Sequence, residues 1–194
     1  MILKKDLIRK KYQQLRDELS EHELEIKSNL ITEKVIKHIK QVKPKVVHCF
    51  MTIEQKKEIN THPIFKYCWN NEIQIVIPVS DFSDNSMRSA LVNKKTVFKK
   101  GIFKIPEPIN LEWIDESSID YIITPLLAFD HDGYSVGYGK GFYDKFFKKL
   151  GSKVIKTGVS IFEKTERIED VKEHDIKLNH CITPSNFYSF YTNG

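Results

Sequence analysis

The sequence predicts an α/β protein, with helices on both faces of a mostly parallel, Rossmann-like sheet in a three-layer α/β/α sandwich. Helical and strand-like segments alternate along the chain, and the strand-like runs at 73–78 and 119–123 are continuously apolar, as in buried strands. No repeat, low-complexity tract or linker interrupts the alternation, so we expect one domain over residues 1–194.

The composition fits one globular core. Of the 194 residues, 40% are hydrophobic and 29% are charged, which are ordinary globular values. No apolar run approaches the ~20 residues needed to cross a bilayer, and the first residues lack the apolar core of a secretory signal. We therefore expect a cytoplasmic protein without membrane contact, and we expect it to be monomeric.

Charge and cysteine content are weaker indicators. The net charge of +5 suits anionic partners such as nucleotides or nucleic acid, but many lysine-rich proteins without a special target share it. No two of the cysteines Cys49, Cys68 and Cys181 have the spacing of metal ligands. We interpret all three as small buried hydrophobic residues.

An amphipathic helix is predicted at the start of the chain. Apolar residues recur there at helical spacing, at Leu3, Leu7, Tyr12, Leu15 and Leu19. Lys5, Arg9 and Arg16 fall on another stripe, which by itself indicates a solvated basic face. We interpret Arg16 as a surface residue.

The remaining segments complete the alternation. Ser20 and Glu23 form a capping box that begins a second helix, and a third helix is predicted from His62. Strands are predicted at 46–51, 73–78, 87–92, 97–105, 119–123 and 154–161, with a short last strand at 181–183. Within the first strand, His48 is interpreted as a satisfied core histidine. Residues 52–61 are interpreted mainly as an exposed loop, and residues 106–108 as rigid and extended.

A glycine-rich run follows the strand at 119–123. Gly133, Gly137, Gly139 and Gly141 precede a short helix whose apolar residues begin at Phe142. Backbone N–H groups of such a loop, just ahead of a helix, make a ready anion site. Lys140 lies between two of the glycines, where its ammonium could reach a phosphate.

Three interpretations of this loop compete. A Walker A loop fails, because five residues separate Gly133 from Gly139-Lys140 and Gly141 replaces the magnesium-binding hydroxyl. A dinucleotide fingerprint is a weak match, since the third glycine comes one place early. A simple surface turn explains the glycines, but not the charged and aromatic residues among them.

The run PLLAFDHDGYSVGYGKGFYDKFF resembles the signature of the 5-formyltetrahydrofolate cyclo-ligases, also called methenyltetrahydrofolate synthetases. The resemblance extends to Lys5 and Arg9, to residues 105–108, and to His174-Asp175. It implies ATP-driven closure of 5-formyltetrahydrofolate to 5,10-methenyltetrahydrofolate, with magnesium as cofactor and small molecules as the partners.

The resemblance also implies a set of site residues. Lys140 and Arg9 match catalytic positions, and Asp144 and Asp175 match the metal positions. Met51, Glu58 and residues 138–142 match folate-contacting positions. ATP contacts are implied along two segments: Lys5, Asp6, Leu7, Ile8 and Arg9, and then Ser135, Val136, Gly137, Tyr138, Gly139, Lys140, Gly141, Phe142 and Tyr143. The sequence departs from many relatives at Ser135 and Val136, where they carry larger or basic residues.

Two other functions remain open from the sequence. Another ATP-dependent small-molecule kinase or ligase could carry the same phosphate loop. A basic nucleic-acid-binding module would use lysines and aromatic residues, but here the lysines scatter along the chain and form no stacking platform.

Overall fold

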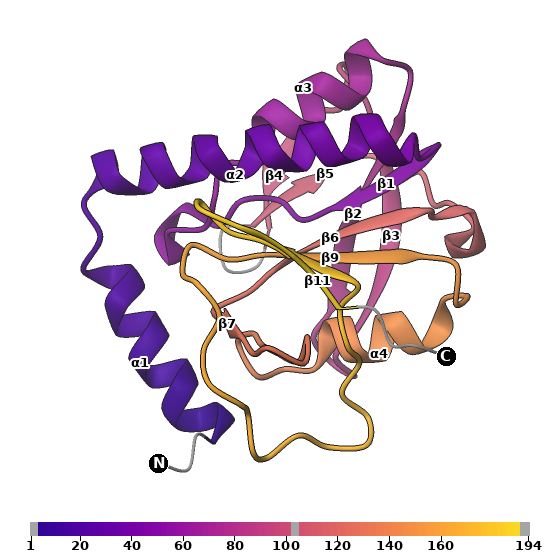
Figure 1. The fold of residues 1–194 in the computed structure, drawn as a ribbon. Coiled ribbons are helices and arrows are strands. Elements are labelled where there is room, and N and C mark those ends of the chain that lie inside the picture. The colour runs from indigo at the N-terminus through magenta and orange to yellow at the C-terminus, as the bar shows by residue number, and fades with distance from the viewer. Residues whose placement is uncertain (1–3, 102–104, 191–194) are drawn as a thin grey trace.

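The computed structural model describes residues 4–101 and 105–190. At its centre is a seven-stranded sheet in the order β11-β10-β9-β6-β1-β2-β3 (Figure 1). The five inner strands run parallel to one another, and the edge strands β3 and β11 pair antiparallel with β2 and β10. The predicted fold class, a mostly parallel sheet between helices, is confirmed.

The element bounds follow the predicted alternation closely. The helices are α1 (Lys5–Asp17), α2 (Glu21–Val42), α3 (His62–Asn70) and α4 (Phe142–Lys149), with short 3-10 turns η1 (Glu54–Lys56) and η3 (Glu116–Ser118). The sheet strands are β1 (Val46–Cys49), β2 (Gln74–Asp81), β3 (Ser86–Val92), β6 (Tyr121–Pro125), β9 (Ile155–Val159), β10 (His180–Ile182) and β11 (Phe187–Ser189). Two small hairpins pair β4 (Phe98–Lys100) with β5 (Pro106–Pro108), and β7 (Ala128–Phe129) with β8 (Ser135–Val136).

Helices α2 and α3 cover one face of the sheet and α4 covers the other. Ile31 and Val35 of α2 pack with Val47 of β1. Phe146 of α4 packs with Val46, the adjacent residue of the same strand. This alternation follows from the two-residue period of a strand. Each fully buried side chain of this size contributes roughly 1.5–3 kcal/mol, so the two cores fix the strand ends on which the site is built.

The second helix begins as predicted. The Ser20 hydroxyl accepts from the Glu23 amide at 3.2 Å, and the Glu23 carboxylate accepts from the Ser20 amide at 2.9 Å. This reciprocal cap satisfies two amides that a helix start would otherwise leave open. The cysteines Cys49, Cys68 and Cys181 are buried and free, as predicted.

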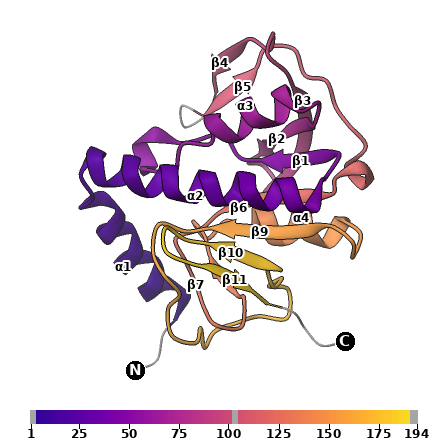
Figure 2. The same cartoon turned by 45° about the horizontal axis from the view of Figure 1, so that its top comes forward.

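The predicted apolar face of the first helix is only partly right: Tyr12 is buried and Leu19 packs against the core, but two of its leucines are exposed. Leu7 is 58% exposed and Leu15 36%, whereas Ile8, Tyr12 and Arg16, spaced four apart, are buried. The cause is the packing partner: α1 lies beside the β7–β8 hairpin (Figure 2) and buries Ile8 and Tyr12 against residues of that hairpin and its flanks. Leu3 lies outside the described residues.

The structure differs from the sequence analysis at four further points. The strand at 181–183 is not the last one, because the aromatic tail returns as β11 beside β10. The β7–β8 hairpin was not predicted, and β4 covers only part of the predicted 97–105 strand, of which 102–104 lie outside the described residues. His48 is fully buried, but neither ring nitrogen has a partner within the described residues. Burial lowers the pKa of His48 to about 3, so the ring is neutral.

Candidate active site

The glycine loop, residues 137–141, joins the β7–β8 hairpin to α4. Gly139 and Gly141 have φ of 90° and 72°, left-handed values that glycine adopts without strain. Gly141 is also the residue that caps the N-terminus of α4. Between them, Lys140 is exposed, and its ammonium has no partner in the described part of the chain. Open amides, a helix start and a free cation together suit a phosphate.

The first turns of α1 are docked onto this loop. Arg9 donates from Nε to the carbonyl of Gly137 at 3.0 Å and also pairs with Asp6 on its own helix. A side chain at Gly139 would place its Cβ 3.0 Å from the guanidinium carbon of Arg9. Arg9 therefore lies against the loop that carries Lys140, and the joint catalytic role of the two residues stays a prediction.

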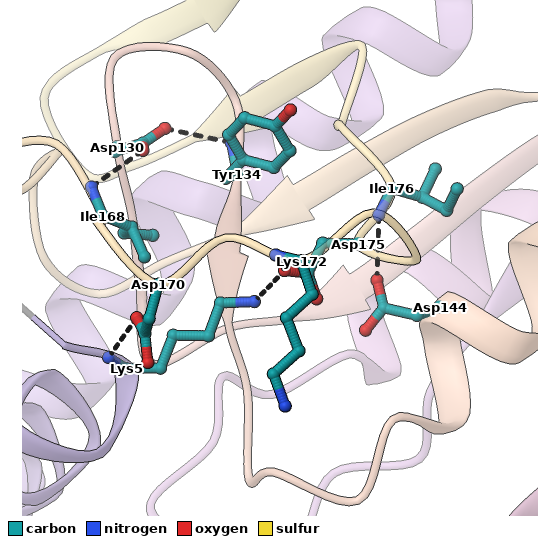
Figure 3. Close-up of polar contacts among 9 residues, drawn as sticks. All are labelled: Lys5, Asp130, Tyr134, Asp144, Ile168, Asp170, Lys172, Asp175 and Ile176. Atoms are coloured by element: carbon teal, nitrogen blue, oxygen red, sulfur yellow. Dashed lines mark hydrogen bonds and ion pairs between the residues drawn. The ribbon is translucent and has the colours of Figure 1, made fainter.

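Lys5 lies at the start of α1 and anchors it to the segment that precedes β10. Its ammonium pairs with Asp175 at 2.5 Å, and its backbone amide donates to Asp170 at 2.8 Å (Figure 3). Asp170 was not predicted as part of the site. No helical or strand pattern marks the polar connection in which it lies, so only the fold reveals the contact.

The two predicted metal ligands come together in the same corner. Asp144, on the first turn of α4, accepts from the amide of Ile176, the neighbour of Asp175, at 3.1 Å (Figure 3). Burial raises the pKa of Asp144, and the negative charge of Asp175 raises it further. Burial also raises the pKa of Asp175, but the hydrogen bonds from Lys172 and Lys5 lower it by more, so the pKa of Asp175 is below its usual value.

This donor set fits magnesium that arrives with a nucleotide. Within the described residues, no group of three or more His, Cys, Asp or Glu side chains could hold a metal alone. Magnesium commonly takes one or two carboxylates and fills its other positions with phosphate oxygens and water. The mutual repulsion of Asp144 and Asp175 is the kind of strain that a divalent cation relieves.

Asp130 supports this corner without belonging to it. Its side chain is fully buried and accepts from the amides of Tyr134 at 3.0 Å and Ile168 at 3.1 Å (Figure 3). It also accepts from the amide of Asp132 at 3.0 Å. These bonds tie the β7–β8 turn to the segment that leads to Asp170. Asp130 is a structural residue, although the sequence places it among the charged neighbours of the glycines.

On its other side the glycine loop contacts a buried carboxylate. Glu58 is 5% exposed, and its two oxygens accept from the Ile53 amide at 2.8 Å and from the Tyr138 hydroxyl at 2.9 Å. The Tyr138 oxygen in turn accepts from Arg16 Nη1 at 3.0 Å. Arg16, Tyr138 and Glu58 form what we call the buried triad. The exposed loop predicted for residues 52–61 is therefore correct only in part, because Ile59 and Thr61 are buried as well as Glu58.

Arg16 is the clearest error of the sequence interpretation. It was predicted to be a surface residue, yet it is 4% exposed and also donates from Nη2 to the carbonyl of Leu126. The spacing of Ile8, Tyr12 and Arg16 contained the signal. It was missed because an arginine is rarely assigned to a buried helical stripe.

Burial shifts the pKa values within the buried triad. It raises the pKa of Glu58, against the opposing effects of the Ile53 and Tyr138 hydrogen bonds and of the Arg16 and Lys56 charges. It also raises the pKa of Tyr138, to which the Glu58 charge adds. Tyr138 therefore keeps its proton and serves as the donor to Glu58.

The structure also describes the remaining predicted contact residues. Phe142 meets Phe82 of the β2–β3 turn edge to face, with 5.4 Å between ring centroids, and Met51 packs against the α2–α3 core. Ile8 and Val136 are core residues, so any nucleotide contact from them would use backbone atoms. The roles of Ser135, Tyr143 and Leu7 toward ATP stay predictions.

A large hollow elsewhere on the surface does not coincide with this site. Its volume is 860 Å³, and it lies where β1, β2 and β6 begin, lined in part by Lys40, Lys43, Tyr67 and Asp120. None of the predicted site residues lines it. The volume of this hollow therefore does not bear on the candidate active site.

The sequence matches the 5-formyltetrahydrofolate cyclo-ligase family over residues 2–184. The chain belongs to this family of enzymes. It is 28% identical to 5-formyltetrahydrofolate cyclo-ligase of Mus musculus over 175 residues, covering 84% of this chain and 85% of the mouse protein. It is 29% identical to the Escherichia coli K12 enzyme over 139 residues, covering 69% and 75% of the two chains.

Solved structures agree with this assignment. The 5,10-methenyltetrahydrofolate synthetase of Aquifex aeolicus superposes with a TM-score of 0.75 at 29% identity, covering 98% of this chain and 94% of that one. A synthetase from Mycoplasma pneumoniae gives a TM-score of 0.74 at 23% identity and covers 93% and 98%, which supports the fold. The resemblance to cyclo-ligases is confirmed, and the predicted site residues from Lys5 to Asp175 all lie within the matched range.

Proposed function

We propose that the chain catalyses the ATP- and magnesium-dependent cyclisation of 5-formyltetrahydrofolate to 5,10-methenyltetrahydrofolate, releasing ADP and phosphate. The observation that carries this proposal is the position of Tyr138. It lies in the glycine loop two residues from Lys140, and its hydroxyl bonds to the buried carboxylate of Glu58. A phosphate site and a polar, desolvated carboxylate thus adjoin, as transfer of a phosphoryl group to a bound folate requires.

The reaction needs an activated oxygen and no protein nucleophile. A formamide carbonyl is a poor electrophile, and its oxygen leaves poorly. Transfer of the γ-phosphoryl group to the formyl oxygen forms a new O–P bond and breaks the bond to ADP. N10 of the folate then attacks the formyl carbon, phosphate departs with the oxygen, and the N10 proton passes to solvent.

The chain contributes positioning and charge neutralisation, as phosphoryl transfer generally demands. Lys140 and the loop amides would hold the transferring phosphate, with positive charge added by Arg9 and Lys5. Arg9 is already held against the loop through Gly137. Lys5 is paired with Asp175, so it can move to phosphate only as that carboxylate takes another partner.

Asp144 and Asp175 would hold the magnesium ion, whose chemistry when bound is to neutralise charge on the phosphate oxygens. On the folate side, Glu58 would accept N–H donors of the pterin ring. Each of its oxygens already takes one hydrogen bond and has a lone pair left for a ligand. Met51, Phe142 and the Tyr138 ring would supply apolar contacts.

The proposed activity is tested by mixing purified protein with 5-formyltetrahydrofolate, ATP and magnesium and recording the absorbance of the methenyl product. We expect the chromophore to appear only when all three are present. ATP consumption with another small molecule, and no chromophore with the folate, would favour a different ATP-dependent kinase or ligase. We further propose that the protein acts in the cytoplasm as a monomer without nucleic acid.

A further inference from the structure

Arg16 has a charge that neither the proposed reaction nor the fold explains. It is almost completely buried, and no carboxylate lies within ion-pair distance of it in the described residues. Its Nη1 and Nη2 donate instead to the hydroxyl of Tyr138 and the carbonyl of Leu126, and its buried Nε has no hydrogen-bond partner in the described residues. Burying a guanidinium with only neutral partners is unfavourable unless a nearby negative charge compensates it.

The nearest compensating group is Glu58, one hydrogen bond further on. Arg16 donates to the Tyr138 oxygen at 3.0 Å, and the Tyr138 hydroxyl donates to Glu58 Oε1 at 2.9 Å. A phenol that accepts from a cation becomes a stronger donor, because hydrogen bonds in a chain polarise one another. The guanidinium also occupies a lone pair of the phenol oxygen, which leaves the hydroxyl proton directed at Glu58.

We propose that Arg16 is a positioning residue that acts through Tyr138 to hold the buried carboxylate of Glu58 charged and oriented for the folate. The inference rests on the proposed function only for the identity of the ligand. Ile53 donates to the second oxygen of Glu58 at 2.8 Å. With donors on both oxygens, the carboxylate is held as an acceptor.

Groups from four elements bear on the charge of Glu58. Arg16 faces it from α1, Lys56 from η1, Tyr138 from the glycine loop and Tyr143 from α4. Lys56 also lies over the Tyr138 ring, 5.8 Å from its centroid. Burial raises the pKa of Glu58, and the cations Arg16 and Lys56 oppose that rise. Removing the buried cation should therefore raise the pKa further.

The sign of the pH dependence follows directly. A ligand that needs the Glu58 carboxylate binds fully above the pKa of that group and loses affinity as pH falls through it. Arg16→Gln should raise the pKa of Glu58. As pH falls, this variant should therefore begin to lose folate affinity at a higher pH than the parent protein does. A purely structural role for Arg16 would weaken binding at every pH without moving this midpoint.

The test is a titration of the unliganded protein by carbon NMR, with glutamate labelled at its carboxyl carbon. The Glu58 signal is assigned by its disappearance in Glu58→Gln. We expect Arg16→Gln to raise the Glu58 pKa by about one unit, and Arg16→Lys, which keeps the charge, to raise it less. The matched control is Arg167→Gln, which removes a guanidinium that is 75% exposed and should leave the pKa unchanged.

The same four proteins are then titrated with 5-formyltetrahydrofolate and, separately, with a non-hydrolysable ATP analogue and magnesium. We expect Arg16→Gln to bind the folate several-fold more weakly near neutral pH, with its midpoint shifted upward, and to bind the nucleotide normally. If Arg16→Gln does not fold, Tyr138→Phe replaces it, because this variant keeps the ring and the bond from Arg16 to Leu126 but breaks the chain to Glu58.

An unchanged Glu58 pKa in folded Arg16→Gln, or in Tyr138→Phe when that variant is used, would overturn the inference. The titration without ligand also separates the two proposals. If the parent protein does not bind the folate, the proposed function fails, and the Glu58 pKa still decides the role of Arg16.

Discussion

The two sides of the glycine loop differ in their exposure to solvent. On one side, Lys140 is exposed and the loop offers backbone amides to solvent. On the other, Glu58 is buried and its hydrogen bonds come from inside the protein. In the proposed function, a phosphate has enough charge to be held by cations in water, whereas an uncharged pterin ring gains orientation from a carboxylate that is already desolvated.

Helix α1 serves both sides. Lys5 and Arg9, in its first turns, contact Asp175 and the glycine loop, while Arg16, in its last turn, contacts Tyr138. At 1.5 Å per residue, Arg9 and Arg16 are separated by about 10 Å along the helix axis. One rigid element therefore sets the distance between the partly buried Lys5 and Arg9 and the buried Arg16.

The largest effect on one side of the loop alone is expected from Lys140→Met. Loss of the cation from the transferring phosphate should lower turnover by ~100-fold or more, the scale of removing one transition-state donor. Stability should barely change, because the side chain is exposed. Lys153→Met removes an exposed lysine beyond α4 and is the matched control. Turnover of a folded Lys140→Met protein within a few-fold of the control would refute the assignment.

A smaller effect is expected from Glu58→Gln, measured as folate affinity by calorimetry. Removing a charged acceptor costs about 1.5–3 kcal/mol, so the folate should bind roughly ten-fold or more weakly. Nucleotide affinity should stay nearly unchanged. Glu54→Gln alters an exposed glutamate on η1 and serves as the control. Equal folate affinities in the two variants would show that Glu58 has no role in binding.

Asp144→Asn tests whether the proposed magnesium site needs this carboxylate. The amide oxygen of asparagine can still accept from Ile176, so the local fold should persist. We expect the magnesium concentration for half-maximal turnover to rise several-fold and the maximal rate to fall. A magnesium dependence identical to that of the parent protein would leave Asp144 with only its role at the start of α4.

The smallest expected effect separates two glycines of the loop. Gly139→Ala forces a side chain into a left-handed conformation and against the guanidinium of Arg9, so unfolding free energy should fall by about 1–2 kcal/mol. Gly137→Ala meets no atom within 4 Å and has no left-handed backbone, so the unliganded protein should keep its stability. Thermal or denaturant unfolding measures both. Equal losses would mean that the docking of Arg9 does not constrain the loop.

Most of the fold was predictable, because the sequence patterns that predict its helices and strands are local. Hydrophobic periodicity predicted the buried strands, and the capping box placed the start of α2 to the residue. The glycine run is a long contiguous pattern, so Lys140 and its neighbours could be found without the fold. The Lys5–Asp175 pair joins positions 170 residues apart, and only the family resemblance placed both in one site.

The errors come from packing partners that the sequence does not name. Arg16 and Leu7 were assigned to the wrong faces because α1 packs on the β7–β8 hairpin, whose two-residue strands are too short to give a periodic signal. The bond between Tyr138 and Glu58 spans 80 positions and two loops. Periodicity describes one element at a time, so a contact between loops lies beyond it.

Paired calorimetric titration of Lys140→Met and Glu58→Gln tests the division between the two sides most directly. Each variant and the parent protein are titrated with a non-hydrolysable ATP analogue plus magnesium and, separately, with 5-formyltetrahydrofolate. The account predicts that Lys140→Met weakens only the nucleotide and Glu58→Gln weakens only the folate. Loss of the same ligand in both variants, or of neither ligand in either, would contradict it.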